Sequence, residues 1–311
     1  MSTPSGAASM SVSVAVSTRD RPDALRRCLA ALAEGLRLPD EVVVVDQSRG
    51  NETQAVVATS ASGIRARYVR HDGAGLGASQ NAAFRAATGN VVAVTDDDCV
   101  PRPDWLARLM DAVASAERPA GVTGRVLPLG PDVAGMYPVS LRTGTERRVL
   151  VHGSLPWDAG SGNNFALRRD WIARIGGNDE RLGPGAPGKG AVDIDLFHRL
   201  LRAGGTILYD PAVVVLHERT SKQGRLSRRY PYGHGMGAAC AMWWRQKDQR
   251  AGSVLSAWMR MRAARMGDGF VRRDWGLVRE EALVLSGTFA GLVFGVRQRA
   301  VAPLAWSLDG N

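Results

Sequence analysis

The first two thirds of the chain alternate short apolar runs, typical of buried strands, with amphipathic stretches typical of helices. Val42–Val45 and Val91–Val94 are continuous apolar runs, as expected for parallel strands buried on both faces. A further strand is predicted over Ser11–Ser17, and apolar residues at helical spacing predict helices at about 18–32, 52–61 and 78–87. This alternation predicts βαβ units, and therefore an α/β domain whose mainly parallel sheet carries its ligand site at the carboxyl ends of the strands.

The pattern becomes less regular in the second half of this region. We expect strands over about 64–69, 121–127 and 206–216, and helices over about 104–116, 168–175 and 192–202. The stretch between 128 and 162 predicts loops. The sequence is therefore interpreted as a flexible start over residues 1–10, one α/β domain over 11–218 with halves at 11–127 and 128–218, and an extension over 219–311.

Charge separates the extension from the rest of the chain. The net charge is +10, yet residues 219–299 alone hold sixteen basic and five acidic residues. Their arginines alternate with Trp and Met in helical stretches, which favours a helix lying on an anionic membrane surface. The alternative, weighted equally, is that the apolar stripes pack on the α/β domain. Nucleic acid is not expected as a partner.

Composition excludes several other classes. The fifteen uncharged residues of Ala282–Val296 fall short of the roughly 20 that cross a bilayer. Three cysteines without a CxxC pair exclude a disulfide framework and a structural zinc site. The first ten residues lack the features of a signal peptide. We therefore expect a cytoplasmic protein, peripheral on the inner face of the plasma membrane if the extension binds lipid.

Two groups of carboxylates are candidates for chemistry. Asp96, Asp97 and Asp98 directly follow a buried strand, and three adjacent negative charges repel one another unless a cation neutralises them. Mg²⁺ or Mn²⁺ suits carboxylates combined with substrate phosphates; the alternative is a solvated acidic turn. Asp193 and Asp195 lie at the start of a predicted helix and offer a general base, or only favourable charges at the helix N-terminus.

The order and spacing of several motifs resemble family 2 glycosyltransferases over about residues 11–218. The motifs are Val14–Asp23, Val42–Ser48, Asn81 with Ala87–Gly89, Val94–Asp98, Gly162–Asn164, Arg174–Gly177, Val192–Leu196 and His217. Each motif is loose alone, but their ordered combination is specific. The resemblance implies a GT-A fold, with a nucleotide-binding half at 11–127 and an acceptor half at 128–218. It also implies inverting transfer of a sugar from a nucleoside diphosphate donor, with a UDP-sugar favoured, to a saccharide, lipid-linked or small-molecule acceptor.

The resemblance also implies roles for individual residues. Asp98 and His217 would hold the metal, Mn²⁺ or Mg²⁺, and Asp193 would be the general base. Val192 stands where the family usually has Glu, which leaves Asp195 open as the alternative base. The remaining implied contacts are the nucleotide-sugar residues Ser17, Thr18, Arg19, Asp46, Asn81, Asp96 and Asp97, and the sugar or acceptor loop Gly162, Asn163 and Asn164.

Two other functions fit parts of the pattern. A nucleotidyltransferase would use similar carboxylates, but it typically needs a Gly- and Lys/Arg-rich loop after the first strand, and this chain has Thr18-Arg19-Asp20 there. A non-catalytic basic membrane-binding protein would not need two separated carboxylate groups. The sequence therefore favours a metal-dependent sugar transferase.

Overall fold

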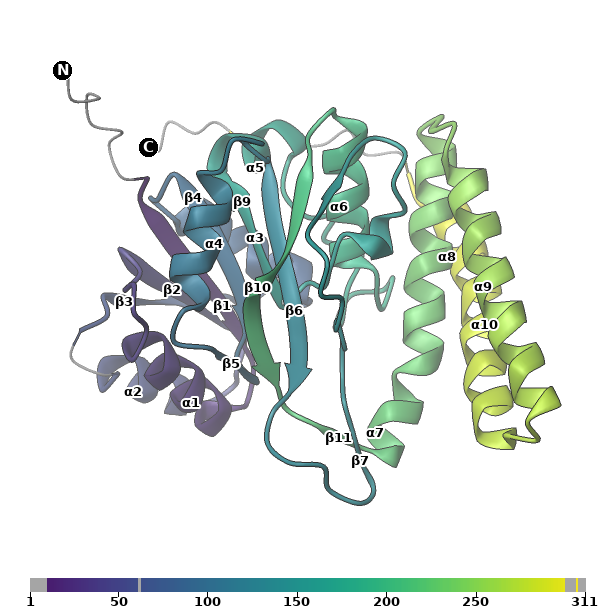
Figure 1. The fold of residues 1–311 in the computed structure, drawn as a ribbon, viewed down its shortest axis with the longest axis horizontal. Coiled ribbons are helices and arrows are strands. Elements are labelled where there is room, and N and C mark those ends of the chain that lie inside the picture. The colour runs from purple at the N-terminus through teal and green to yellow at the C-terminus, as the bar shows by residue number, and fades with distance from the viewer. Residues whose placement is uncertain (1–9, 61–62, 300–305, 307–311) are drawn as a thin grey trace.

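A twisted sheet with helices on both faces forms the body of the protein, and three long helices stand beside it (Figure 1). The structure is a computed structural model and describes residues 10–60, 63–299 and 306. Nine of the described strands form one sheet in the order β3-β2-β1-β4-β9-β6-β10-β5, with β8 pairing with β10. The predicted α/β architecture with a mainly parallel sheet is confirmed, while residues 1–9 of the predicted flexible start lie outside the described residues.

The first four strands of the sheet are parallel. They are β1 (Val12–Thr18), β2 (Glu41–Asp46), β3 (Ala66–Arg70) and β4 (Val91–Asp96). Strand β1 lies between β2 and β4, so Thr18 pairs with Asp46 and Ser17 pairs with Asp96. The register therefore brings the polar residues that end these strands to one edge of the sheet.

The other half of the sheet contains a strand that the sequence did not predict. Strand β9 (Asn164–Arg168) runs antiparallel to both β4 and β6 (Gly121–Pro128). Strand β10 (Ile207–His217) pairs in parallel with β6 and antiparallel with β5 (Cys99–Pro101) and β8 (Arg148–Leu150). Strand β9 was missed because its five residues lie between a loop-rich stretch and a helix, too few to show a period.

Helices cover the two faces with separate apolar cores. On one face lie α1 (Pro22–Ala33), α2 (Glu52–Ala58) and α4 (Trp105–Val113). On the other lie α3 (Leu76–Ala86), α5 (Arg169–Ile175) and α6 (Val192–Arg202). The predicted helices agree with these to within a few residues at their ends. Both faces of the central strands are buried, which explains their continuous apolar runs.

The extension is helical, as predicted. A short pair of strands, β7 (Met136–Tyr137) and β11 (Thr220–Ser221), leads into α7 (Lys222–Ser227), α8 (Arg229–Arg245), α9 (Ala251–Val271) and α10 (Trp275–Arg297). Helices α8 and α10 meet through glycines, and a Cβ atom on any of them would overlap the backbone of the facing helix: Gly233, Gly237, Gly287, Gly291 and Gly295. Within the described residues, every helix is too short or too polar to serve as a bilayer-crossing segment.

The inner side of the extension packs on the body through α6. The Trp243 indole donates a hydrogen bond to Asp195 (2.7 Å) and stacks on His198, with ring centroids 3.8 Å apart. His198 Nε2 in turn lies 2.7 Å from Asp248 Oδ2. The apolar residues of this contact include Leu182, Val192, Met236 and Val254. One side of the extension is therefore buried against the body, and its outer side is free.

Candidate active site

The acidic run at the end of β4 forms one wall of the site. Asp97 is buried, and its Oδ2 accepts a hydrogen bond from Thr18 Oγ1 at the end of β1 (2.7 Å). Burial raises the pKa of Asp97 to about 6, although Arg21 and Thr18 oppose this shift. Burial also raises the pKa of Asp96 well above its usual range, and the neighbouring carboxylates of Asp98 and Asp97 raise it further. These three carboxylates therefore lie where a positive charge would be strongly favoured.

Arg21, for which no role was predicted from the sequence, supplies part of that positive charge. Its guanidinium lies 2.9 Å from Asp97 Oδ1 and 2.6 Å from Asp98 Oδ2. Arg21 immediately precedes α1, which begins at Pro22. Its place in the loop that follows the first strand was the available signal, since that loop ends beside the acidic run in a parallel sheet.

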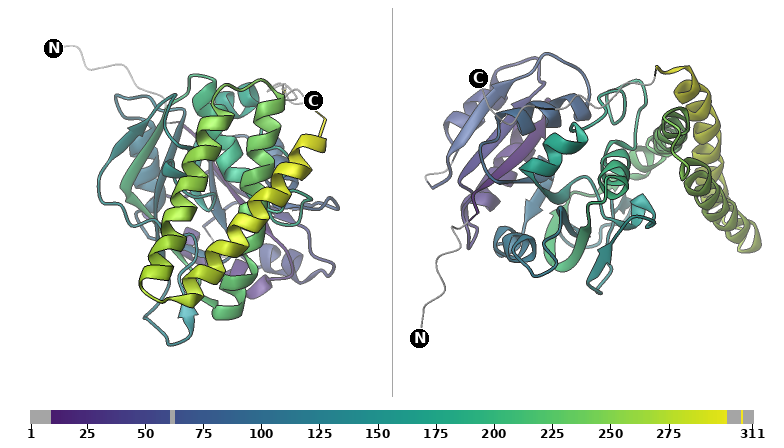
Figure 2. Two further views of the ribbon diagram at one scale, coloured as in Figure 1. Left: turned by 90° about the vertical axis from the view of Figure 1, so that its right-hand side faces the viewer. Right: turned by 90° about the horizontal axis from the view of Figure 1, so that it is seen from above.

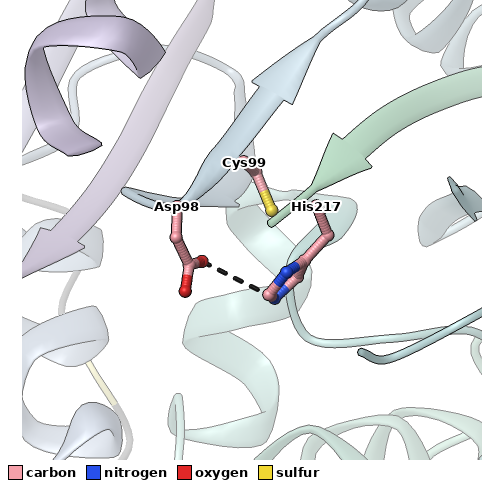
Figure 3. A group of neighbouring side chains, drawn as sticks. All are labelled: Asp98, Cys99 and His217. Atoms are coloured by element: carbon pink, nitrogen blue, oxygen red, sulfur yellow. Dashed lines mark ion pairs between the residues drawn. The ribbon is translucent and has the colours of Figure 1, made fainter. Parts of the chain in front are cut away.

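Asp98, just before β5, and His217, the last residue of β10, face each other (Figure 3). His217 Nε2 lies 3.6 Å from Asp98 Oδ1, which is buried and has no hydrogen-bond partner among the described residues. His217 Nδ1 donates to the carbonyl oxygen of Glu218 (2.7 Å), so Nε2 is the nitrogen left to act as a ligand. Burial lowers the pKa of His217, which favours the neutral imidazole that binds metals.

These groups fit a divalent cation. Potential ligand atoms of Asp98, Cys99 and His217 all lie within 4.8 Å of one another. Burial raises the pKa of the Cys99 thiol well above its usual range, so the sulfur stays protonated and is a poor ligand for a hard cation. A carboxylate and an imidazole with phosphate oxygens suit Mn²⁺, and Mg²⁺ less well because of the imidazole.

The second carboxylate group separates into two different environments. Asp195 is buried and accepts hydrogen bonds from Arg199 Nε and Trp243 Nε1, both at 2.7 Å. Asp193 is only partly buried, and its Oδ2 accepts a hydrogen bond from the backbone N–H of Gly162 (2.9 Å). The Asp193 charge also contributes to the raised pKa of Asp96. Asp193 therefore lies within electrostatic reach of the acidic run, whereas Asp195 joins α6 to the extension.

The loop before β9 lies against Asp193 at the start of α6. Gly162 approaches α6 so closely that a Cβ atom would lie 2.9 Å from Asp193 Cβ. Asn163 is buried, and neither atom of its side-chain amide has a hydrogen-bond partner among the described residues. Asn164 instead accepts from Trp105 Nε1 (2.8 Å) and donates to two backbone carbonyls. Asn163 is thus the member of this loop with amide groups left for a ligand.

Several residues assigned to the nucleotide bind protein neighbours instead. Asp46 is fully buried and accepts from the Ser48 backbone N–H (2.8 Å) and the Tyr68 hydroxyl (2.9 Å). Asn81 bonds the backbone of Asn178 through both its amide nitrogen and oxygen (3.0 and 2.8 Å). These contacts shape the loops at the sheet edge. Direct nucleotide contact by Asp46 or Asn81 stays a prediction.

A cavity of about 350 Å³ lies at the ends of the first three strands. Ser17 Oγ, at the end of β1, accepts a hydrogen bond from Ser79 Oγ (2.8 Å). Arg19, in the loop that follows, is half exposed and lines the cavity. The other lining residues are Gln47, Ser48, Arg49, Arg70, His71, Asp72, Gly73 and Ala74. Three arginines in one small cavity suit an anionic ligand.

Residues 13–176 match the profile of glycosyl transferase family 2. A pre-mycofactocin glycosyltransferase of Mycobacterium tuberculosis is 30% identical over 274 residues, which cover 83% of this chain and 54% of the relative. The chain thus spans about half the length of that relative. The succinoglycan biosynthesis protein ExoM of Rhizobium meliloti is 29% identical over 79% of this chain and 78% of its own length.

Solved structures are similar in fold. The mannosyltransferase PcManGT from Pyrobaculum calidifontis, in complex with GDP-Man and Mn²⁺, superposes with a TM-score of 0.62 at 18% identity, covering 92% of this chain and 88% of its own. TarS residues 1–349 of S. aureus, in complex with UDP-GlcNAc, has a TM-score of 0.57 at 16% identity over 74% of this chain and 66% of its own. At these identities the likeness shows the fold alone.

Proposed function

Because this chain belongs to glycosyltransferase family 2, we propose that it is a metal-dependent, inverting enzyme that moves a sugar from a nucleoside diphosphate donor to an acceptor hydroxyl. The observation that carries the proposal is the meeting of two carboxylate groups with different surroundings. Asp98 faces His217 at one wall, and Asp193, held by the Gly162 N–H, lies within electrostatic reach of the same acidic run.

The division of roles follows from this geometry. Asp98 and His217 would hold the cation, whose charge, when bound, would stabilise the leaving diphosphate. The amide of Asn163 is buried in the same loop as Gly162, which binds Asp193, and would donate to the sugar or to a phosphate oxygen. Arg21 adds a fixed positive charge beside Asp97 and Asp98.

Asp193 is the proposed general base. In an inverting reaction, the acceptor oxygen bonds to the anomeric carbon as the bond to the diphosphate breaks, and the hydroxyl proton moves to a carboxylate on the attacking side. The backbone N–H of Gly162 fixes Asp193 Oδ2, and the Ile194 N–H bonds Oδ1 (2.9 Å). Asp195 is less suited to this role because it is buried and its charge is paired with Arg199.

For the donor we favour a UDP-sugar, with its nucleotide part in the cavity lined by Arg19 and Gln47. GDP-sugars belong in the test because the P. calidifontis neighbour is complexed with GDP-Man. The acceptor is proposed to be a saccharide, a glycolipid or a small molecule. The basic extension is proposed to bring the enzyme to an anionic membrane surface.

Donor hydrolysis across a panel of UDP- and GDP-sugars with Mn²⁺ tests the proposal. One donor should be hydrolysed, EDTA should stop the reaction, and added Mn²⁺ or Mg²⁺ should restore it. Asp98→Asn should lower the rate at least about 10²-fold, because it weakens the cation's hold on the developing charge. Asp111→Asn, an exposed aspartate on α4, is the matched control and should be unchanged. Full turnover in EDTA would refute the metal role.

A further inference from the structure

The turn between α9 and α10 exposes three large apolar side chains. Phe270, Val271 and Trp275 are 51%, 85% and 65% exposed, and the two aromatic rings pack edge to face with centroids 5.9 Å apart. Phe270 and Val271 end α9 and Trp275 begins α10, so the three side chains flank the turn. Exposed aromatic residues at a protruding turn are characteristic of surfaces that bind another phase or partner.

Unpaired cations surround this apolar group. Arg272 and Arg273 form the turn itself and are exposed, and no ion pair among the described residues involves either side chain. Arg279, one turn into α10, is also exposed and unpaired there. Four acidic residues lie nearby. Glu280 and Glu281 are each paired with two other arginines, Asp268 is exposed, and Asp274 caps α10 by accepting from the Leu277 N–H (3.0 Å). The turn therefore combines aromatic bulk with a net positive charge.

A second apolar projection lies at the same end of the molecule. Val133, in the loop between β6 and β7, is 53% exposed, and Met136, the first residue of β7, is 38% exposed. In Figure 1, and from the side in Figure 2, this loop, α7 and the α9–α10 turn all lie toward the lower end. Strands β6 and β10 also point their carboxyl ends, with His217, in this direction. Between the two projections, Lys222 and Arg228 of the α7 segment are exposed.

We propose that this end of the molecule docks on an anionic membrane. The α9–α10 turn would insert Phe270, Val271 and Trp275 among the lipid headgroups, while Arg272 and Arg273 bind the headgroup charges. The occupant is a lipid surface because exposed apolar side chains lie beside exposed arginines without ion pairs among the described residues, a combination that suits anionic headgroups over an apolar layer. Docked in this way, the carboxyl edge of the sheet faces the bilayer.

The upper end of the extension provides an internal comparison. At the α8–α9 turn, Trp244 is 65% exposed, as is Trp275, and Arg245 and Lys247 lie beside it. That turn has one large exposed apolar residue instead of three, and it lies at the opposite end from the carboxyl edges of β6 and β10 (Figure 1). Matched substitutions at the two turns therefore distinguish a specific docking end from nonspecific membrane binding by exposed Trp and Arg residues.

Co-sedimentation of the full chain with vesicles tests the docking end without donor or acceptor, so its outcome is independent of the sugar-transfer proposal. The vesicles are phosphatidylcholine alone or phosphatidylcholine with phosphatidylglycerol. The chain should bind only the anionic vesicles. Binding should weaken as salt rises, since the Debye length, over which charges attract, falls to about 10 Å at 0.1 M salt. Trp275→Ser should weaken binding roughly tenfold, from the loss of one buried aromatic side chain, whereas Trp244→Ser should not.

The charge requirement has its own matched pair. Arg272→Glu combined with Arg273→Glu should abolish binding to anionic vesicles, whereas Arg245→Glu combined with Lys247→Glu should leave most of it. Circular dichroism checks that all four variants keep their helices. Equal binding to neutral vesicles, or stronger loss from the upper-turn variants, would overturn the proposal. So would failure of the wild-type chain to sediment, or a dimer in solution that Trp275→Ser dissociates, which would assign the turn to a second copy.

Discussion

The body and the extension of this protein use different residues for their internal packing. In the body, large and β-branched side chains fill both faces of the sheet, and polar residues appear where strands end, as at Thr18, Asp46 and Asp96. In the extension, α8 and α10 approach backbone to backbone through glycines. The body thus concentrates polar residues at one edge of its sheet. The extension buries Trp243 and Trp258 but leaves Phe270 and Trp275 more than half exposed.

Helix α6 joins the two regions and divides its side chains between them. Asp193 at its start faces the Gly162 loop, whereas Asp195 and His198 hold Trp243 and Asp248 of the extension. Residues two apart on a helix point about 200° away from each other, so the two aspartates cannot serve one partner. Asp193 should therefore affect chemistry, and Asp195 stability.

The largest expected effect tests this division directly. Asp193→Asn keeps the size and one acceptor oxygen but removes the base, so sugar transfer at saturating donor should fall about 10²- to 10⁴-fold while donor binding persists. Asp195→Asn breaks a buried ion pair with Arg199 and should instead lower the free energy of unfolding by about 3 kcal/mol. Transfer rates and denaturant unfolding of both variants provide the measurement. Wild-type transfer by Asp193→Asn would refute the assignment, and a folded but inactive Asp195→Asn would move the role to Asp195.

A smaller effect tests the glycine packing of the extension. A Cβ atom on Gly291 would overlap the carbonyl oxygen of His234, so Gly291→Ala should force α8 and α10 apart and cost about 2 kcal/mol of stability. Gly267→Ala in α9 meets no atom within 4 Å and should stabilise the protein by about 0.5–1 kcal/mol, as Ala does in helices. Thermal unfolding compares the two. Equal effects would show that α8 and α10 do not depend on close backbone contact.

The smallest expected effect is the pH dependence of the junction. Burial lowers the pKa of His198, although the nearby carboxylates of Asp248 and Asp195 act to raise it. Burial acts to raise the pKa of Asp248, but the hydrogen bond from His198 and the nearby positive charges outweigh it, so this pKa is lowered. The unfolded chain therefore binds a proton near pH 6.5 that folded His198 does not, and stability should fall as pH drops from about 7.5 to 5.5, by at most about 1.4 kcal/mol per pH unit for this group. Asp248 adds to the loss only below about pH 4.

The slope isolates His198 when two variants are compared. His198→Gln should reduce the loss of stability between pH 7.5 and 5.5, measured by denaturant unfolding at each pH. His152→Gln, at an exposed position, should leave the slope unchanged. An unchanged slope in His198→Gln would assign the pH dependence to other groups.

Much of the body was predictable because its signals are local. Four consecutive apolar residues mark β2 and β4, and the acidic run at the end of β4 needs no distant partner to be recognised. The sequence favoured Asp193 as the base but left Asp195 open, because Trp243, whose indole binds Asp195, is 48 residues away along the chain. The packing role of the glycines in α8 and α10 likewise could not be predicted, because it depends on the contact between two helices that are distant in sequence.

Arg21 gives the site a property that its aspartates alone could not. Its guanidinium lies between the carboxylates of Asp97 and Asp98, so the fold carries a covalently attached counter-ion for the acidic run. One guanidinium offsets part of the charge of the three carboxylates whether or not a metal ion is bound. A cation held by Asp98 and His217 would then serve mainly to bind the diphosphate, and the loops around it would rely less on the ion to keep their shape.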